Sequence, residues 1–170
     1  CWNLDFFTMG HDEIHSCFEE HRQDADVTIV EGNKGLFDGL DVEGSDSNAA
    51  LAVRLGLPVI LVIDVTGITR GIAPLLTGYT GFDPDVQIVG VILNRVAGPR
   101  QESKLRAAIE RYSDLPVLGT IGRTSGLGIE ERHLGLVPGN EDPDALSRIK
   151  QIADVVEKGV DLDAVLALTA

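Results

Sequence analysis

The chain has 170 residues, 44% of them hydrophobic, and a formal net charge of −13 at pH 7. This length predicts one domain with a proper core, and the acidic balance excludes nucleic acid and anionic membrane surfaces as expected partners, because both bind basic surfaces. There is no apolar run of membrane length, and Cys1 and Cys17 lack CxxC or metal-ligand spacing, so we expect a reduced, cytoplasmic setting.

The first third of the chain predicts two helices around a short strand. Residues 9–23 carry apolar side chains at helical spacing amid charged residues. Val27–Val30 is rich in β-branched side chains, which predicts a buried strand. Residues 45–48 offer helix caps for a helix over residues 49–55, and Gly56 ends that helix.

The middle of the chain alternates between strand and helix signals. Val59–Asp64 is a continuous apolar run that ends in an acid, as in a strand buried on both faces. A helix is expected over residues 68–81 and a strand over residues 86–94. Lys104–Tyr112 predicts an amphipathic helix, and Val117–Ile121 predicts a short strand.

The last part predicts one more short strand and two helices. We expect the strand at Leu134–Val137, a long amphipathic helix from Asp142 to about Glu157, and a short helix from Asp161. Strands that alternate with helices predict an α/β fold, with a mostly parallel sheet covered by helices on both faces.

Two acids stand out beyond the predicted strand Val27–Val30. Glu31 follows it directly, and Asp38 lies seven residues on in a loop with three glycines. Ligands of open parallel sheets gather beyond the carboxyl ends of the strands. Carboxylates on a glycine-rich loop suit Mg²⁺ with its bound phosphates. From the spacing alone, a turn with two solvated acids explains the pattern equally well.

The loop Glu31–Gly39 reads EGNKGLFDG and resembles the EGxxGLxDG signature of the cobyrinic acid a,c-diamide synthase family. These proteins are glutamine-dependent amidoligases related to dethiobiotin synthetase. Further blocks match the family in the same order, at Asn3–Asp5, Gly90–Asn94, Pro116–Gly119 and Glu131–Pro138. The resemblance covers essentially the whole chain and implies a P-loop NTPase-like fold of the dethiobiotin synthetase type.

The chain contains no GxxxxGK[ST] loop, which normally opens such a domain. Gly32–Gly35 is no substitute, because no Ser or Thr follows its lysine at the required position. The resemblance implies that the first strand and the P-loop lie before Cys1, and that a glutamine amidotransferase domain lies after Ala170. We therefore expect residues 1–170 to be the central and C-terminal part of an ATP-binding amidoligase domain, inactive by itself.

The resemblance also implies a chemistry. Family members use ATP to convert a side-chain carboxylate of a tetrapyrrole to an acyl phosphate, which ammonia from glutamine then attacks. Glu31 matches the family acid that holds Mg²⁺, and Asp38 matches a second acid near the phosphates or the reacting carboxylate, so both are implied catalytic residues. Gly32, Gly35 and Gly39 shape the loop at the cofactor, as turn positions with positive φ or by close approach.

Other polar residues are candidates for binding. Asn94 resembles the asparagine that reads adenine in this superfamily, although it also suits a cap of the following turn. Arg95 is a candidate to pack on the base or to be a solvated arginine. Asp64 caps the next turn or binds water or metal. Lys34 and Arg70 are candidates to receive a polycarboxylate substrate.

The substrate and the function class stay open at this point. Where Asn33 and Lys34 stand, typical cobyrinate enzymes carry apolar residues, and the pair resembles a branch, found beside dissimilatory sulfite reductases, that is thought to amidate sirohaem. Cobyrinate and sirohaem are thus the two candidate tetrapyrroles. A partitioning-type ATPase switch and a non-catalytic interaction module are the alternatives. We expect exposed sheet edges to allow a homodimer.

Overall fold

The computed structural model describes residues 2–123, 131–132, 135–136 and 145–168. The chain forms two compact units, and each is described by itself. The first unit comprises Cys1–Val59 with Pro84–Gln87, and the second comprises Ile60–Asp83 and Ile88–Leu168.

Helix α1 of the first unit spans His11–Arg22, close to the predicted range. Its apolar face buries Ile14 and Phe18, which are spaced one helical turn apart. The guanidinium of Arg22 lies over the Phe18 ring, 5.5 Å from its centre. The helical period in the sequence thus predicted the buried side of this helix correctly.

Helix α2 spans Asn48–Leu55, and both of its predicted ends are confirmed. The hydroxyl of Ser47 is the N-cap and accepts a hydrogen bond from the Ala50 amide at 3.1 Å. Gly56 closes the helix in the left-handed region, at a φ of 64°.

The predicted buried strand at Val27–Val30 is wrong. The structure gives these residues no regular secondary structure, and the Ile29 side chain is 85% exposed. A strand is stable only when neighbouring strands satisfy its backbone groups, and within the described part of the chain residues 27–30 pair with no strand. Glu31 therefore follows an extended, exposed segment instead of a strand end.

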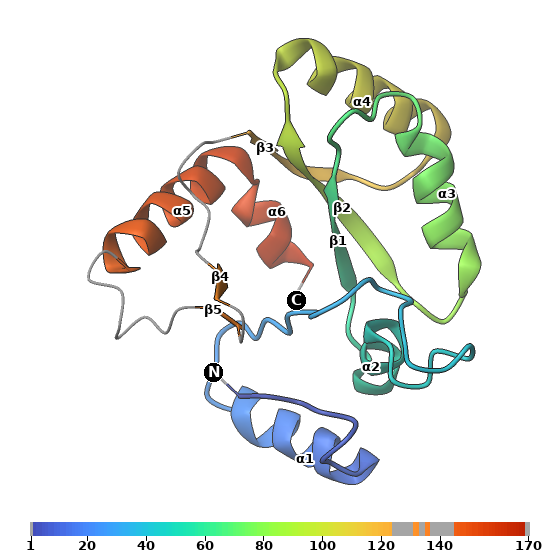
Figure 1. Cartoon of the computed structure of the whole chain (residues 1–170), viewed down its shortest axis with the longest axis vertical. Helices are drawn as coiled ribbons and strands as arrows, with labels where there is room; N and C mark the ends of the chain where they lie inside the picture. Colours follow the sequence, from blue (N-terminus) through green and yellow to red (C-terminus); the bar gives the residue numbers. More distant parts are fainter. Residues whose placement is uncertain (1, 124–130, 133–134, 137–144, 169–170) are drawn as a thin grey trace. The chain divides into compact units, whose positions relative to one another are not determined.

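The second unit contains a three-stranded parallel sheet in the order β1-β2-β3 (Figure 1). The strands are β1 (Val59–Asp64), β2 (Ile88–Val96) and β3 (Val117–Gly122). All three strands were predicted within two residues of their ends. The predicted α/β class with a parallel sheet is confirmed.

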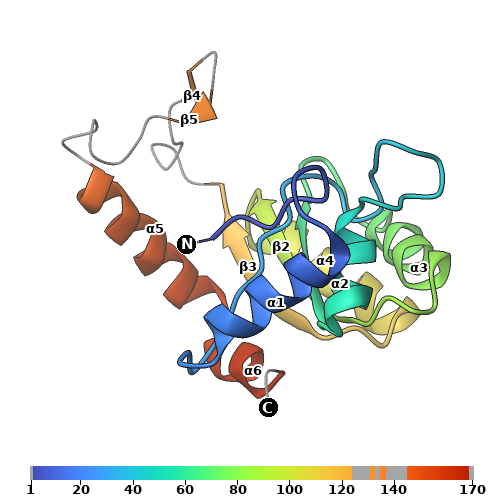
Figure 2. The same ribbon diagram turned by 90° about the horizontal axis from the view of Figure 1, so that it is seen from below.

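In the described part of the second unit four helices accompany this sheet, and helices lie on both sides of it in Figures 1 and 2. Helices α3 and α4 contact each other, and helices α5 and α6 both contact β3. Their bounds are Ile72–Phe82 for α3, Pro99–Tyr112 for α4, Ala145–Gly159 for α5 and Leu162–Ala167 for α6.

Two neighbouring residues of β3 show that helices cover both faces. The Thr120 hydroxyl donates a hydrogen bond to Glu102 of α4 at 3.0 Å. Gly119 instead faces the end of α5, where an added Cβ would lie 2.7 Å from the Gly159 carbonyl oxygen and 2.8 Å from the Val160 Cα. Because successive residues of a strand point to opposite faces, α4 and α5 lie on opposite faces of the sheet.

The core of the second unit lies between the sheet and α3 with α4. Fully buried side chains come from β2, from α3 and from α4, and include Val91, Leu93, Leu76, Leu105 and Ile109. Burial of this apolar surface is the main force that holds the layers together.

One expectation about β1 is wrong. Its apolar run predicted burial on both faces, but the Val62 side chain is 63% exposed. The strand lies at an edge of the described sheet, and the described residues leave the face at Val62 largely uncovered.

The region after β3 is described only in pieces. Strands β4 (Glu131–Arg132) and β5 (Gly135–Leu136) form an antiparallel pair. The predicted strand at 134–137 overlaps β5, while its ends and the predicted helix start at 142 lie outside the described residues. Among the described helices, none combines the length and apolar character needed to cross a membrane.

Candidate functional site

The predicted site residues fall into two groups, one in each unit. Glu31, Lys34 and Asp38 belong to the first unit, and Asn94 with Arg95 belongs to the second. Each group has its own network of contacts.

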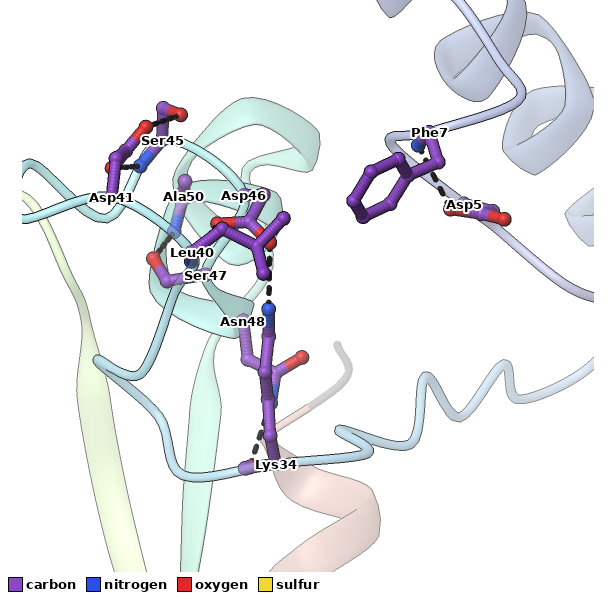
Figure 3. Close-up of polar contacts among 10 residues, drawn as sticks. All are labelled: Asp5, Phe7, Lys34, Leu40, Asp41, Ser45, Asp46, Ser47, Asn48 and Ala50. Carbon is purple, nitrogen blue, oxygen red and sulfur yellow. Dashed lines mark hydrogen bonds and ion pairs between the residues drawn. The ribbon is translucent and has the colours of Figure 1, made fainter.

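In the first unit, the carboxylate of Asp46 holds the glycine-rich loop (Figure 3). One oxygen accepts a hydrogen bond from the Lys34 ammonium at 2.8 Å, and the other accepts the Leu40 backbone N–H at 2.8 Å. These bonds hold the pKa of the Asp46 carboxyl below its usual range, with the bond from Lys34 as the main cause. A single side chain thus connects Lys34 within the loop to Leu40, which directly follows it.

Asn48, the first residue of α2, makes a second connection to the same loop. Its Nδ2 donates to the Lys34 carbonyl oxygen at 2.8 Å, as Figure 3 shows. The same amide group packs against Gly32, where an added Cβ would lie 2.8 Å from Nδ2. Residues 45–48 were predicted as helix caps, and two of them, Asp46 and Asn48, also fix the loop.

The glycines of the loop serve close approach. An added Cβ would collide with the Asp38 carboxylate at Gly35, and would lie 2.7 Å from Asp46 Oδ1 at Gly39. The alternative of a positive φ is wrong for Gly32, Gly35 and Gly39, since the left-handed glycine in this segment is Gly44, at a φ of 69°.

The two predicted catalytic acids are exposed. The backbone N–H of Asp38 donates to the Gly35 carbonyl oxygen at 3.1 Å, which turns the chain so that the carboxylate lies over Gly35. Glu31 has no hydrogen bond or ion pair with any described residue, so its oxygens are accessible to a cation. A single carboxylate fits Mg²⁺, which keeps several waters and takes other oxygens from phosphates. Among the described residues, no cluster of three or more acids, histidines or cysteines is arranged to enclose a metal.

A small hollow adjoins the loop. Asp41 lies on its wall and accepts hydrogen bonds from the Ser45 backbone, at 2.9 Å, and from the Ser45 hydroxyl. These bonds hold the pKa of Asp41 below its usual range. The residues that line the hollow are Phe6, Phe7, Leu40, Asp41, Ser45 and Asp46. Of these side chains, Phe7 is 76% exposed.

In the second unit, polar side chains gather at the carboxyl ends of the strands. Asp64 ends β1, and its Oδ1 accepts the Thr66 backbone N–H at 2.8 Å, which confirms the predicted turn cap. Its Oδ2 lies 3.2 Å from Nη1 of Arg95, near the end of β2. The bond from Thr66 is the main cause of a lowered pKa at Asp64, and Arg95 adds to it.

Asn94 uses its side-chain oxygen locally, because Oδ1 accepts the Arg95 backbone N–H at 2.9 Å. This bond agrees with the predicted alternative of a local cap. The amide nitrogen has no acceptor among the described residues, so it is available to donate to a ligand.

Arg70, a predicted substrate ligand, lies elsewhere in the second unit. Its Nη2 donates to the Tyr112 hydroxyl at 3.3 Å, and this bond is the main cause of a lowered pKa at Tyr112. Tyr112 is the last residue of α4, whereas Arg95 precedes the first residue of that helix, Pro99, by four positions. With a rise of about 1.5 Å per residue, the helix is about 20 Å long, and the structure does not bring Arg70 and Arg95 together.

The sequence analysis missed Asp46 and Asn48 as parts of the site. A signal was present in the sequence, because four polar residues stand at positions 45–48. One capping residue is enough at the start of a helix, so the others were available for another role. The ion pair between Asp64 and Arg95 was also missed, because thirty-one residues separate its partners.

The chain is similar in sequence to a known family. Residues 8–131 match the family described as AAA domain. No solved structure matches the chain.

Curated relatives confirm the resemblance to cobyrinate synthases. A cobyrinate a,c-diamide synthase of Magnetococcus marinus is 51% identical over 170 residues, covering 100% of this chain and 36% of the relative. The protein of that name from Listeria monocytogenes serovar 1/2a is 40% identical over 98% of this chain and 37% of its own length. The one from Methanosarcina acetivorans is 39% identical over 99% and 36%. The chain thus spans about a third of the length of these relatives.

Proposed function

The chain belongs to the AAA domain family, and we propose that it is part of an ATP- and glutamine-dependent amidoligase acting on cobyrinate in the cytoplasm. The observation that carries the proposal is 51% identity to a protein named cobyrinate a,c-diamide synthase over the whole of this chain. The signature Glu31–Gly39 lies within the matched residues.

In this proposal, ATP phosphorylates a side-chain carboxylate at the a or c position, and ammonia released from glutamine displaces the phosphate to leave an amide. Mg²⁺, when bound, would offset the negative charge of the phosphates. Glu31 would hold it, since its carboxylate is exposed and engaged by no described residue. Asp38 would face the reacting carboxylate, with its position set by the contact with Gly35.

Nucleotide binding is assigned to the loop and to the end of β2. Gly32 and Gly35 would admit the phosphates close to the backbone. Asn94 would donate its amide nitrogen to the adenine edge, and the Arg95 guanidinium would stack on the base.

Substrate binding is assigned to Lys34 and Arg70. The Lys34 ammonium has three donors, and Asp46 uses one of them, which leaves two for a substrate carboxylate. Arg70 is exposed beside Tyr112 and would meet a peripheral carboxylate.

Sirohaem is a second candidate substrate, on the single observation that Asn33 and Lys34 occupy the signature loop. A lysine there adds a positive charge where a carboxylate approaches. The other substrate-binding residues would be shared by both tetrapyrroles, because both present carboxylates at the rim of a macrocycle.

The test is product formation by the protein at its full natural length. It would be incubated with cobyrinate or sirohaem, with ATP and glutamine each present or omitted, and the products analysed by mass spectrometry. We expect cobyrinate diamide only with both ATP and glutamine. Amidation of sirohaem alone would replace the substrate, and ATP hydrolysis driven by DNA without any amide would support a partitioning-type switch instead.

A second check concerns residues 1–170 alone. They contain no GxxxxGK[ST] loop, so we propose that the isolated chain forms no amide and binds ATP weakly. Addition of glutamine would not change this, because the donor is proposed to be processed by a separate amidotransferase domain.

A further inference from the structure

Strand β2 contains a distortion near its carboxyl end. Its pairing with β3 shifts register between Leu93 and Val96. Within the shift, Arg95 has a φ of 62° and is the one non-glycine residue with a positive φ in the described part of the chain. Side chains other than glycine adopt this conformation at a cost in free energy. Such bulges re-aim a side chain and occur often beside functional sites.

Three contacts hold Arg95 in this conformation. Its backbone N–H donates to Asn94 Oδ1 at 2.9 Å, and its carbonyl oxygen accepts from Arg123 Nε at 3.3 Å. Its guanidinium donates through Nη1 to Asp64 Oδ2 at 3.2 Å. The partners come from the ends of β1, β2 and β3, so the carboxyl edge of the sheet fixes this arginine from three sides.

Stability does not account for this arrangement. The ion pair is open to water, with 60% of the Arg95 side chain and 49% of the Asp64 side chain exposed, and exposed pairs contribute little to folding. The positive φ of Arg95 costs free energy, and the exposed ion pair with Asp64 offsets little of that cost. An exposed, oriented guanidinium at a strand end is the arrangement that a ligand with a flat face would use.

We propose that Asp64 is a positioning residue that fixes the plane of the Arg95 guanidinium so that it stacks on the purine base of a bound nucleotide. This inference rests on the proposed function, since it assumes that the protein binds ATP. Asp64 acts through Arg95 and does not touch the nucleotide. The Oδ1 atom holds the turn at Thr66, so the two oxygens of Asp64 have separate tasks.

The separate tasks suggest a selective substitution. Asp64→Asn keeps an oxygen that accepts the Thr66 N–H but removes the charge that aligns Arg95. Arg95→Lys keeps the charge and removes the flat guanidinium. Glu19→Gln is the matched control, because it breaks an exposed ion pair of the same kind with Arg22 on helix α1.

The experiment measures binding of ATP, adenosine and inorganic tripolyphosphate to the full-length protein by calorimetry. We expect Asp64→Asn and Arg95→Lys each to weaken ATP and adenosine about 3- to 5-fold, the range of an exposed cation–π contact, and to leave tripolyphosphate binding unchanged. The double variant should bind like Arg95→Lys alone, and Glu19→Gln like the unaltered protein.

Three results would overturn the inference while leaving the proposed function intact. The first is unchanged ATP binding in Asp64→Asn. The second is a double variant in which the two losses of ATP affinity multiply. The third is a loss of tripolyphosphate affinity as large as the loss of ATP affinity. If Asp64→Asn fails to fold, the comparison of adenosine with tripolyphosphate in Arg95→Lys decides in its place. An unaltered protein that binds no ATP would overturn the proposed function as well.

Discussion

The ammonium of Lys34 lies 2.8 Å from the carboxylate of Asp46, twelve residues further on, and the second oxygen of that carboxylate accepts the Leu40 N–H. The predicted metal loop is therefore closed by a side chain that lies outside its signature. We expect the conformation of the loop, and with it the position of the two proposed catalytic acids, to depend on this carboxylate.

Exchange of the Leu40 amide hydrogen tests this closure. Asp46→Ala removes the acceptor, and we expect exchange of the Leu40 amide to accelerate at least about tenfold, because the hydrogen bond that protects it is lost. Asp46→Asn retains an acceptor oxygen and should leave most of the protection. Exchange read by NMR that is equally fast in both variants would contradict a role for this bond.

Gly35→Ala is expected to affect activity much more than stability. The new methyl group would collide with the Asp38 carboxylate, which is exposed and free to rotate away at small cost. Asp38 is proposed to face the reacting carboxylate, and misplacement of such a group by about 1 Å costs up to about a hundredfold in rate. We therefore expect the amidation rate to fall by about tenfold or more at an unchanged melting temperature. Gly78→Ala is the control, because its added Cβ meets no atom within 4 Å.

Gly119→Ala is expected to affect stability much more than activity. Its Cβ would lie 2.7 Å from the Gly159 carbonyl oxygen and 2.8 Å from the Val160 Cα, and backbone atoms cannot rotate away. Overpacking of this kind costs about 1–3 kcal/mol, which urea unfolding will measure. The helical control Gly78→Ala should gain about 0.5–1 kcal/mol instead. Equal stabilities would show that α5 does not pack on β3 as described.

The acid stability of the protein should depend on Glu102. Hydrogen bonds from Arg106 and Thr120 hold the pKa of its carboxyl below 4.5, the ordinary value. The folded state thus binds the proton less readily than the unfolded state, so this contribution to stability is present above about pH 4.5 and is lost as the pH falls through the folded pKa. Glu102→Gln should lower stability at neutral pH and flatten the acid limb.

The measurement is the urea midpoint at a series of pH values between about 3 and 7. Glu110→Gln on the same helix α4 is the control, since Glu110 makes no ion pair with the described residues. A variant with an acid limb as steep as that of the unaltered protein would contradict the role given to Glu102.

Local sequence signals predicted most elements and missed the contacts between distant residues. The helical period around Ile14 and Phe18, the Ser47 cap and the stop at Gly56 depend on neighbouring residues, and the structure confirms them. Val27–Val30 has the composition of a strand but no partner strand in the described part of the chain. The composition of a segment indicates that it can form a strand. Whether the strand forms depends on a second segment that pairs with it.

The candidate site shows the same contrast between features with a local sequence signal and contacts between distant residues. The signature located the loop of Glu31 and Asp38, because glycines and acids at fixed spacing are visible in a sequence. The contacts of Asp46 with the loop depend on how the chain turns at Gly44, and the bulge at Arg95 depends on register with β3. The bulge has no local sequence signal, and for Asp46 the sequence offers only the surplus of polar residues at positions 45–48.

The central claim is that Glu31 holds the metal of an amidating ATP site, and the most direct test is the rate of Mg²⁺-dependent cobyrinate amidation by full-length Glu31→Gln. Glu43→Gln is the matched control, an exposed acid of the same unit. We predict that Glu31→Gln loses about a hundredfold or more in rate at unchanged stability, as expected when charge stabilisation of the transition state is removed, while Glu43→Gln retains full activity. A Glu31→Gln protein that amidates cobyrinate at the rate of the unaltered protein would contradict the account.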